Sequence, residues 1–393
     1  MLHIERIRHD IVALGRRTAQ NSESRQGALA RAEEWLHAAG APAELREHLT
    51  PLLAAVDADA TRWHGCLPCE HDHIDAWVTA EGLPHPGTIL IGADGSQIYP
   101  DRHALVLYYL IQVGALIFRY DGGTPTPDSR EWLRYREEDL FDQQGYLIGP
   151  ETLGMVRMVW EMQVLADLAA RERDDAADEV FALTDGPLLW PYAERTRAAS
   201  VQFDAYLGAL EAVGRAGAIP VGYVDRPGGR PLLDLLWATR LDSDELIARA
   251  EDNPLRSRVD EELMVRILLP GEWSPWFTRP TPTNRRHAGQ GQEVWFCYAN
   301  LGSDRGPAIA RIEVPGWAAV REETMKGLRS ALQHQATALD GYPYVLARAH
   351  EEALVTTQDK AYLEDAIQQA LLGEGVVARP SDKARQKQLL GRR

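Results

Sequence analysis

The sequence predicts an α/β fold in which buried strands alternate with helices. Two apolar runs carry this prediction, residues 88–94 and residues 180–185, and each ends in an aspartate followed by a glycine. A short apolar run bounded by a turn residue is typical of a buried strand. Between the two runs, residues 151–173 have the spacing of a helix. Strand, helix and strand in succession favour parallel pairing in one sheet.

The bulk composition is that of a globular protein. The 393 residues are enough for one elaborate domain or two, and 45% hydrophobic with 25% charged residues is ordinary for such a chain. No apolar run approaches the roughly 20 residues of a membrane helix. The N-terminus is charged and periodic, which is not typical of a signal peptide. Three cysteines argue against a disulfide scaffold, so we expect a cytoplasmic protein.

The net charge of −16 restricts how this protein can meet nucleic acid. An acidic protein repels phosphate backbones at long range, so any attraction must come from a basic groove, bound metal ions or a partner subunit. The C-terminal tail, residues 376–393, is one basic stretch. We favour a solvated tail over a dedicated phosphate-binding arm there.

The remaining elements follow from periodicity and from turn residues. We expect a helical N-terminal extension over 1–84, a main domain over 85–375 with a loop or insertion at 119–149, and the basic tail. Within the main domain the expected strands are 87–93, a strand or hairpin in 104–118, 179–184, 219–224, and an antiparallel hairpin of 294–299 with 308–314. The expected helices are 151–173, 193–216, much of 231–270, 318–338 and 343–371, and 271–292 is expected to be a loop.

Asp94 and Asp185 are the first candidates for chemistry. If their strands lie side by side, two carboxylates meet at one edge of the sheet, which is unfavourable unless a cation lies between them. A divalent metal site is therefore the first hypothesis. The alternative is ordinary turn chemistry, because Asp-Gly is a common turn dipeptide and recurs at 121–122 and 340–341.

Glu161 and His350 add two further candidate ligands. Glu161 lies on the apolar face of the helix 151–173, where a carboxylate is costly unless it is paired or bound to metal. An ion pair with Arg157, one helical turn earlier, is the alternative. His350 follows Pro343, which suits the first turn of a helix. Its alternative is a satisfied histidine in the core.

A further candidate is the cluster Cys66, Cys69, His64, His71 and His73. The two cysteines have the spacing of zinc ligands, but a second cysteine pair is missing and all ligands would come from one short loop. We therefore favour no zinc here. No Walker A, Rossmann glycine or Ser-His-Asp pattern is present, which argues against nucleotide hydrolysis and acyl transfer.

Taken together, these segments resemble the NurA nuclease family. The resemblance rests on the order of short motifs across roughly residues 85–370. They are Ala93-Asp94-Gly95-Ser96-Gln97, a helix carrying Glu161, Thr184-Asp185-Gly186-Pro187-Leu188, the strand Val221–Val224 with a basic residue after it, and Tyr342-Pro343 with His350 eight positions after the tyrosine. Glu151 and Glu172 are nearby alternatives to Glu161.

The resemblance implies a fold and an activity. The fold would be RNase H-like, a mixed sheet flanked by helices. The activity would be that of a manganese-dependent DNA nuclease, with 5′ to 3′ exonuclease and single-strand endonuclease action. It would act as a dimer with a hexameric HerA-type translocase in DNA end resection.

The resemblance also assigns roles to residues. Asp94, Glu161, Asp185 and His350 would be the metal ligands, and Tyr342 would line the site. Relatives have lysine after the third strand where this chain has Asp225-Arg226, so Arg226 is expected as the phosphate contact in its place. Oxygen ligands with one imidazole suit Mn²⁺, with Mg²⁺ as a weaker competitor.

Two other functions fit the same sequence. One is a catalytically inert RNase H-like subunit with a structural or regulatory role in a DNA translocase complex. The other is a metal-dependent phosphatase that acts on small substrates.

Overall fold

Two compact units make up the chain in the computed structural model, which describes residues 3–58, 63–69, 73–142, 144–173, 179–193 and 196–376. Unit 1 consists of Met1–Gly82, Val224–Glu322 and Ala336–Tyr342. Unit 2 consists of Leu83–Tyr223, Glu323–Gln335 and Pro343–Arg393. Residues 377–393 of the expected basic tail lie outside the described residues. The domain boundaries expected from the sequence stay a prediction.

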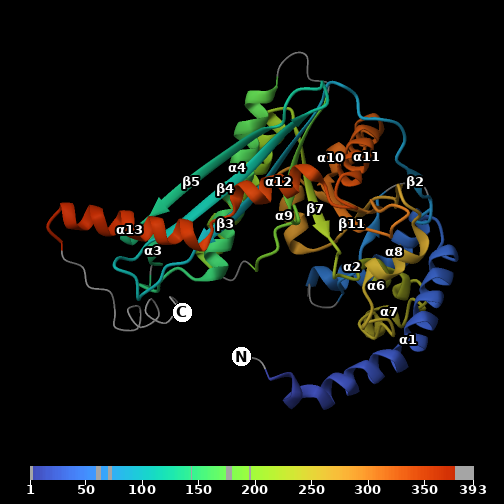
Figure 1. Cartoon of the computed structure of the whole chain (residues 1–393). Helices are drawn as coiled ribbons and strands as arrows, with labels where there is room; N and C mark the ends of the chain where they lie inside the picture. The colour runs from blue at the N-terminus through green and yellow to red at the C-terminus, as the bar shows by residue number, and fades with distance from the viewer. Residues whose placement is uncertain are drawn as a thin grey trace. The chain divides into compact units, whose positions relative to one another are not determined.

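A mixed sheet with helices against it forms unit 2 (Figure 1). Its strand order is β7-β6-β3-β4-β5, in which β3 pairs with β6 and β6 with β7 in parallel, whereas β3–β4 and β4–β5 are antiparallel. This confirms the predicted mixed sheet flanked by helices. The bounds of its strands are β3 Thr88–Ile98, β4 Tyr109–Arg119, β5 Thr126–Arg134, β6 Glu179–Asp185 and β7 Ile219–Asp225.

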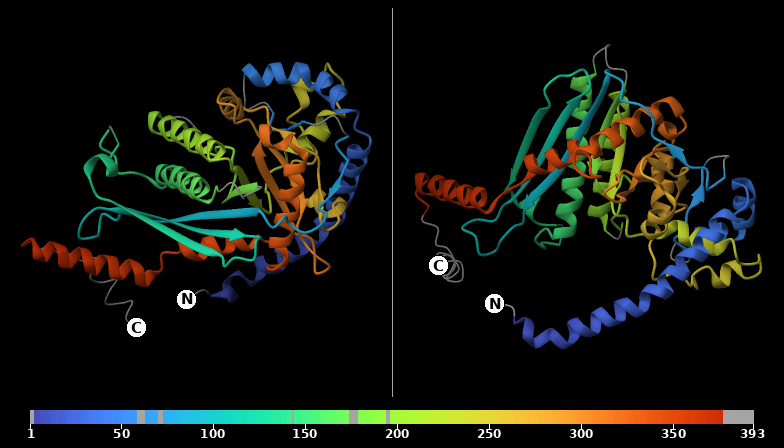
Figure 2. Two further views of the ribbon diagram at one scale, coloured as in Figure 1. Left: turned by 90° about the horizontal axis from the view of Figure 1, so that it is seen from above. Right: turned by 45° about the vertical axis from the view of Figure 1, so that its right-hand side comes forward.

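Helices lie against the strands of this sheet. The helix α4 packs on β3, β4 and β6 and on α5, whereas α12 packs on β3 and β4. Figure 2 (left) shows α4 and α5, drawn in green, on one side of the strands and the red α12 on the other. The bounds are α3 Glu137–Leu140, α4 Pro150–Glu172, α5 Arg197–Arg215, α11 Glu322–Thr337, α12 Tyr344–Ala353 and α13 Thr357–Gly373.

Unit 1 has its own core, built around the hairpin of β10 and β11 and the helices α1, α2, α6 and α8. Its helices are η1 Ile4–Ile7, α1 Arg8–His37, α2 Pro42–Ala58, α6 Pro231–Ala238, α7 Leu246–Arg249, α8 Asp260–Ile267, α9 Pro282–Gly289 and α10 Gly316–Ala319. Its strands are β1 Leu67–Pro68, β2 Val78–Thr79, β8 Glu272–Trp273, β9 Phe277–Thr278, β10 Val294–Asn300 and β11 Ile309–Pro315. The predicted antiparallel hairpin is confirmed by the pairing of Val294 with Pro315 through Asn300 with Ile309.

Two predictions about the strands near Asp94 were wrong. The first expected its strand to end at Asp94, but β3 continues to Ile98 because residues 89–98 all pair with β4. Ladder hydrogen bonds thus override the turn preference of Asp94-Gly95. The second expected residues 119–149 to be a loop or insertion, but they contain the strand β5, which belongs to the main sheet. This strand is polar because it lies at the edge of the sheet with little burial, so it lacks the apolar signal of a core strand.

The predicted helix over 343–371 is two helices in the structure. The first, α12, ends at Ala353, and α13 begins after Thr356. The Thr356 hydroxyl accepts from the Asp359 backbone N–H at 3.1 Å, and the Asp359 carboxylate accepts from the Thr356 N–H at 2.9 Å. This capping box starts a new helix, and the sequence spacing Thr-x-x-Asp is its signal. The expected loop over 271–292 also contains β8, β9 and α9.

A search for membrane-spanning segments among the described helices found none with the length and apolar character that crossing a bilayer requires.

Candidate functional site

The two candidate aspartates lie on neighbouring parallel strands of unit 2. The ladder between β3 and β6 runs to the pair Ala93 and Thr184, and Asp94 and Asp185 are the next residues on each strand. Asp185 is exposed at the end of β6, and Gly186 follows it with a φ of 147°. That left-handed region suits glycine, so the predicted turn is confirmed at Asp185. The strand pairing therefore brings the two positions to adjacent points of the sheet.

His350 contacts Asp94 directly. Nδ1 of His350 lies 2.6 Å from Oδ2 of Asp94, within hydrogen-bond distance. The other oxygen, Oδ1, accepts from the Gly95 backbone N–H at 2.8 Å. The His350 side chain is 57% exposed and that of Asp94 only 15%. The alternative of a buried core histidine is therefore wrong, and the pair presents an accessible imidazole on a partly buried carboxylate.

Glycines explain how α12 comes close enough to bring His350 to Asp94. A Cβ on Gly92 of β3 would lie 2.8 Å from the Val345 carbonyl oxygen, and one on Gly114 of β4 would collide with the backbone at Ala353. The Ser96 hydroxyl donates to the carbonyl of Ala353, so the end of α12 is also tied to β3. Residue-type reasoning did not find these glycines, although a glycine inside a strand is a known sign of close backbone approach.

Glu161 approaches the same strand from the other face of the sheet. Side chains alternate along a strand, so Asp94, like Gly92, points toward α12 and Gly95 points away from it. A Cβ on Gly95 would meet Oε1 of Glu161 and the side chain of Arg157, both on α4. The absence of a side chain at Gly95 is what admits them. Glu161 is 6% exposed, as its place on the apolar face of α4 predicted.

The surroundings of Glu161 disfavour its negative charge. Nε of Arg157 lies 3.2 Å from Oε1 of Glu161, so the alternative ion pair is present. Neither atom makes a hydrogen bond, however, because Arg157 uses Nη1 to donate to the Gly95 carbonyl at 2.7 Å. Burial, together with the nearby charges of Asp94 and Asp185, raises the pKa of Glu161 to about 8 against the opposing effect of Arg157. A buried carboxylate of this kind is stabilised when a cation binds it.

The other glutamates of α4 have different surroundings. Glu172 accepts from Nε of Arg119 at 2.8 Å. Glu151 is exposed in the first turn of the helix. Among the three candidates, Glu161 is the one whose pKa responds to both Asp94 and Asp185.

The side chains of Asp94, Glu161, Asp185 and His350 are of the types that bind a divalent cation. In the structure, however, His350 contacts Asp94, and Glu161 forms an ion pair with Arg157. Across the described ranges, no group of three or more His, Cys, Asp or Glu side chains is already arranged to hold a metal. The orphaned Oε1 of Glu161, the carboxylates of Asp94 and Asp185, and the imidazole of His350 are nevertheless the oxygen and nitrogen donors that Mn²⁺ or Mg²⁺ takes.

Tyr342 and Arg226 belong to unit 1, so their roles stay predictions. Tyr342 is half-buried, and its backbone N–H donates to Leu339 at 3.4 Å. Arg226 is exposed after β7 with a φ of 43°, a left-handed conformation that is strained for a side chain of this size.

The cysteine pair of unit 1 does not form a metal cluster with its described neighbours. Cys66 is buried, Cys69 is half-buried, and His64 and His73 are exposed. Burial raises the pKa of the Cys66 thiol, helped by Asp260 and Cys69, which opposes the thiolate that zinc requires. His71 lies outside the described residues. Among the described residues, none of the three cysteines forms a disulfide.

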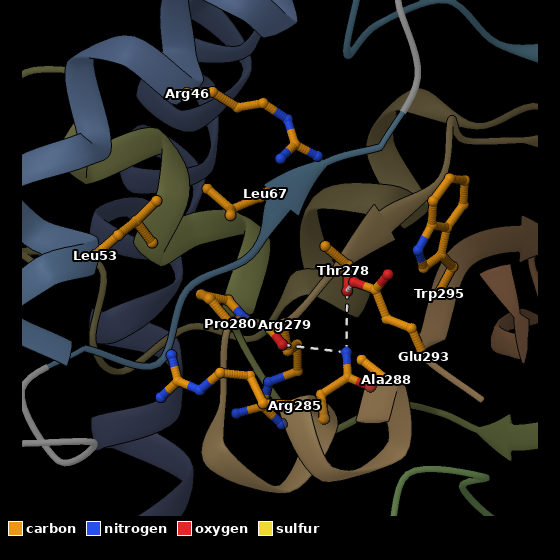
Figure 3. Close-up of a pocket in the computed structure, with 11 residues that line it drawn as sticks. Arg46, Leu53, Leu67, Thr278, Arg279, Pro280, Arg285, Ala288, Glu293 and Trp295 are labelled. Atoms are coloured by element: carbon orange, nitrogen blue, oxygen red, sulfur yellow. Dashed lines mark hydrogen bonds between the residues drawn. The ribbon is translucent and has the colours of Figure 1, made fainter. Parts of the chain in front are cut away.

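Unit 1 also contains a cavity of about 380 Å³ that differs in chemistry from the aspartate site (Figure 3). Arg46, Arg279 and Arg285 line it together with Trp295, and Glu293 is its one lining carboxylate. Asn284, another lining residue, holds two neighbouring lining residues in place: its Nδ2 donates to the Thr278 hydroxyl at 3.0 Å and to the Arg279 carbonyl at 3.2 Å. A cavity rich in arginine attracts anions, so it does not resemble a site that collects carboxylates around a metal.

Comparison with known proteins adds a family assignment to this geometry. The NurA domain profile matches residues 88–355. A crystal structure of NurA bound to dAMP and manganese is 11% identical, covers 83% of this chain and 95% of that chain, and has a TM-score of 0.42. A NurA structure with manganese is 10% identical, covers 84% and 97%, and has a TM-score of 0.37. Argonaute from Marinitoga piezophila is 12% identical, covers 70% and 31%, and has a TM-score of 0.29. No curated protein matches the chain.

Proposed function

Because this chain belongs to the NurA family, we propose that it is a metal-dependent DNA nuclease. The observation that carries the proposal is the contact between His350 and Asp94, with Asp185 at the adjacent position of the next strand. Three groups from distant parts of the sequence come to one region of unit 2. Carboxylates and an imidazole gathered in one region can bind the divalent metal that a phosphodiester hydrolase uses.

In this proposal Asp94, Asp185 and His350 hold the metal, and Glu161, which lies on the other face of the sheet, would have to reach past Gly95 to join them as the fourth ligand. Mn²⁺ is preferred over Mg²⁺ because one donor is an imidazole. When bound, the divalent ion activates water and stabilises the charge that develops on the phosphate. It also reverses the local sign of the field, which lets a chain of net charge −16 accept a phosphodiester. The buried, unbonded Oε1 of Glu161 supports a ligand role for that residue.

The protein's own side chains prepare the site. The carboxylate of Asp94 fixes the His350 ring through Nδ1, which leaves Nε2 as the ring atom that faces a ligand or accepts a proton. The exposed imidazole is accessible to a strand end, whereas Glu161 is held out of water under Gly95. Arg157 compensates part of the negative charge of Glu161 and anchors α4 to β3 through the Gly95 carbonyl.

The finer activity follows the family resemblance. We propose 5′ to 3′ exonuclease and single-strand endonuclease action in the end resection of double-strand breaks, as part of DNA repair by homologous recombination. The chain would act as a homodimer with a HerA-type hexameric ATPase, in the cytoplasm. Tyr342 would stack on a base or orient a terminal phosphate, and Arg226 would contact a phosphate.

A nuclease assay on a labelled single-stranded oligonucleotide tests this proposal. We expect cleavage with Mn²⁺, weaker cleavage with Mg²⁺ and none with EDTA. Asp94→Ala and Asp185→Ala should abolish cleavage and leave the fold intact. The matched control is Asp121→Ala, which alters another Asp-Gly dipeptide whose carboxylate caps its own turn at Gly123. Cleavage at the normal rate by either site variant contradicts the assignment.

A second candidate function is the inert RNase H-like subunit of a translocase complex. It is favoured by one observation, that the ligands meet in pairs and not as a formed cluster within the described part of the chain. Calorimetric titration with Mn²⁺ separates the two, since an inert subunit gives no heat. The phosphatase alternative is tested by comparing cleavage of the oligonucleotide with that of a chromogenic phosphate monoester.

A further inference from the structure

A second cavity of unit 1, of about 400 Å³, is lined by arginine. We call it the arginine cavity. It lies around the two glycines Gly228 and Gly229 after β7 and the start of α6. Its lining includes a single carboxylate, that of Asp234, against five guanidinium groups: Arg230, Arg256, Arg258, Arg279 and Arg311. This concentration of positive charge is unexpected in a chain with a net charge of −16.

Three of the five arginines have carboxylate partners. Nε of Arg230 lies 3.1 Å from Asp234, an Nη of Arg258 lies 3.5 Å from Glu262, and an Nη of Arg311 lies 2.7 Å from Glu313; these contacts are the complete set of ion pairs among the lining arginines in the described residues. Their charges are therefore largely balanced. They also fix the walls of the cavity, because each partner lies on the same secondary-structure element or beside it.

Arg256 and Arg279 have no such partner. Across the residues that the structure describes, neither guanidinium has a hydrogen bond or an ion pair. Arg256 is exposed at the rim, whereas Arg279 is half-buried. Two guanidinium groups without a direct acceptor among the described residues therefore remain in the lining of one cavity.

Two buried donors lie in the wall of the cavity. Nε of Arg279 and Nε of Arg311 are both buried and lack a hydrogen-bond acceptor. Burial and the neighbouring Arg311 lower the pKa of Arg279, whereas the nearby Glu313 opposes them, so the two guanidinium groups lie close enough to repel each other. An unsatisfied buried donor is costly, and an anion that accepts from both would remove that cost together with the repulsion.

The arrangement favours a polyanion over a single ion. Arg279 lines the arginine cavity and also the neighbouring cavity of Figure 3, which Arg46 and Arg285 line as well. Guanidinium groups spread over two adjoining cavities match successive phosphates along a strand. We propose that the arginine cavity binds backbone phosphates of a nucleic-acid strand. This rests on the proposed function, of which it would be a substrate-binding part separate from the carboxylates.

Binding without catalysis tests the proposal. Fluorescence anisotropy with a labelled thymidine oligonucleotide is measured in EDTA over a range of salt concentrations, using the full chain. Arg256→Gln should weaken binding about three- to tenfold at low salt, and the plot of log K against log salt should lose about 0.7 of its slope, the value for one phosphate contact on a single strand. The double variant Arg256→Gln with Arg279→Gln should show a larger loss of affinity and a larger loss of salt slope. The matched control is Arg305→Gln, which removes one exposed arginine of unit 1 that pairs with Asp340 away from the cavity.

A stability control covers the double variant, because Arg279 is half-buried. Arg256 lies on the surface, so Arg256→Glu reverses a charge without disturbing the core, and it should weaken binding more than Arg256→Gln. Wild-type affinity and salt slope in both Arg256 variants overturn the proposal. If inorganic phosphate or pyrophosphate binds the wild type and not the variants, while oligonucleotide affinity is unchanged, the cavity serves a small phosphorylated ligand and the proposal is equally overturned.

The outcome is distinguishable from failure of the nuclease itself. If the wild-type chain cleaves DNA with Mn²⁺ and the arginine variants still bind strands normally, the nuclease assignment holds and the proposed role of the arginine cavity fails. If the wild-type chain binds strands through these arginines but does not cleave them, the proposed role of the cavity holds and the nuclease assignment fails.

Discussion

Nδ1 of His350 lies 2.6 Å from Oδ2 of Asp94, although 256 positions of sequence separate the two residues. The contact joins the second turn of α12 to the middle of β3. It is the geometric basis for assigning chemistry to this unit, since it makes an exposed imidazole and a carboxylate act together. The predictions below test this contact, the packing that creates it, and the buried groups around it.

Replacing His350 tests whether the imidazole is a ligand or a support. His350→Ala should lower Mn²⁺-dependent cleavage by more than the roughly 10- to 100-fold that follows the loss of a group which only orients a ligand. The reason is that the proposed role places Nε2 on the metal or the substrate. Single-turnover cleavage of a labelled oligonucleotide across a Mn²⁺ titration measures this. A loss of less than about tenfold at every Mn²⁺ concentration would contradict the ligand role and leave His350 as a supporting residue.

Replacing the glycines beneath α12 tests the packing that delivers His350. Gly114→Ala should destabilise the protein by about 1–3 kcal/mol, because the new Cβ has no space against the backbone at Ala353. Cleavage should fall further than stability explains, since α12 must move away from β4. Urea unfolding and nuclease rate are measured on the same samples. The control is Gly208→Ala on α5, where a Cβ meets nothing within 4 Å. Unchanged stability and rate in Gly114→Ala would contradict this account.

Replacing Glu161 tests whether a bound metal offsets the cost of burying its carboxylate. Without metal, Glu161→Gln should be at least as stable as wild type at neutral pH, because the buried carboxylate must take up a proton on folding to lose its charge, whereas an amide is already neutral. With Mn²⁺ the order should reverse. Binding at about 100 times Kd stabilises the wild type by about 2.7 kcal/mol, and the variant should gain much less. Thermal unfolding with EDTA and with Mn²⁺ measures both. Equal stabilisation of the two proteins by Mn²⁺ would exclude Glu161 as a ligand.

His287 gives unit 1 a stability that depends on pH. Burial lowers the pKa of His287 from 6.5 to about 4, so the folded protein keeps the ring neutral while the unfolded chain takes up a proton. The unfolded state binds more protons between pH 6.5 and pH 4, so stability falls as the pH falls through that window, by on the order of 3 kcal/mol in total. Urea unfolding at pH 7.5 and pH 5 should show a smaller loss in His287→Gln than in wild type. Identical losses would contradict the prediction.

Much of the fold was readable from the sequence because local patterns carried it. The apolar runs before Asp94 and Asp185, the helical period around Glu161, and the Pro343 helix start each predicted an element that the structure contains. Burial of one face of a helix or strand leaves a period in the sequence, and this period does not depend on distant contacts. The same patterns, read with their order along the chain, also predicted the family.

Where the local sequence signal was weak, pairing with a neighbouring strand determined the secondary structure. The strand β5 is polar and edge-placed, and it is a strand because β4 offers it hydrogen bonds along residues 109–117. The continuation of β3 past Asp94 depends on the same neighbour. Local preference for a turn at Asp-Gly was the weaker effect once a full ladder was available.

The sequence by itself determined which residue types could serve a metal and which strands and helices carry them. Only the tertiary structure decided that Asp94 meets His350 on one face of the sheet while Glu161 reaches Gly95 from the other. The physical reason is packing. Gly92 and Gly114 leave room for α12 to approach β3 and β4, and Gly95 leaves room for α4 to approach β3. Which side chain fills that room depends on contacts between segments far apart in the chain.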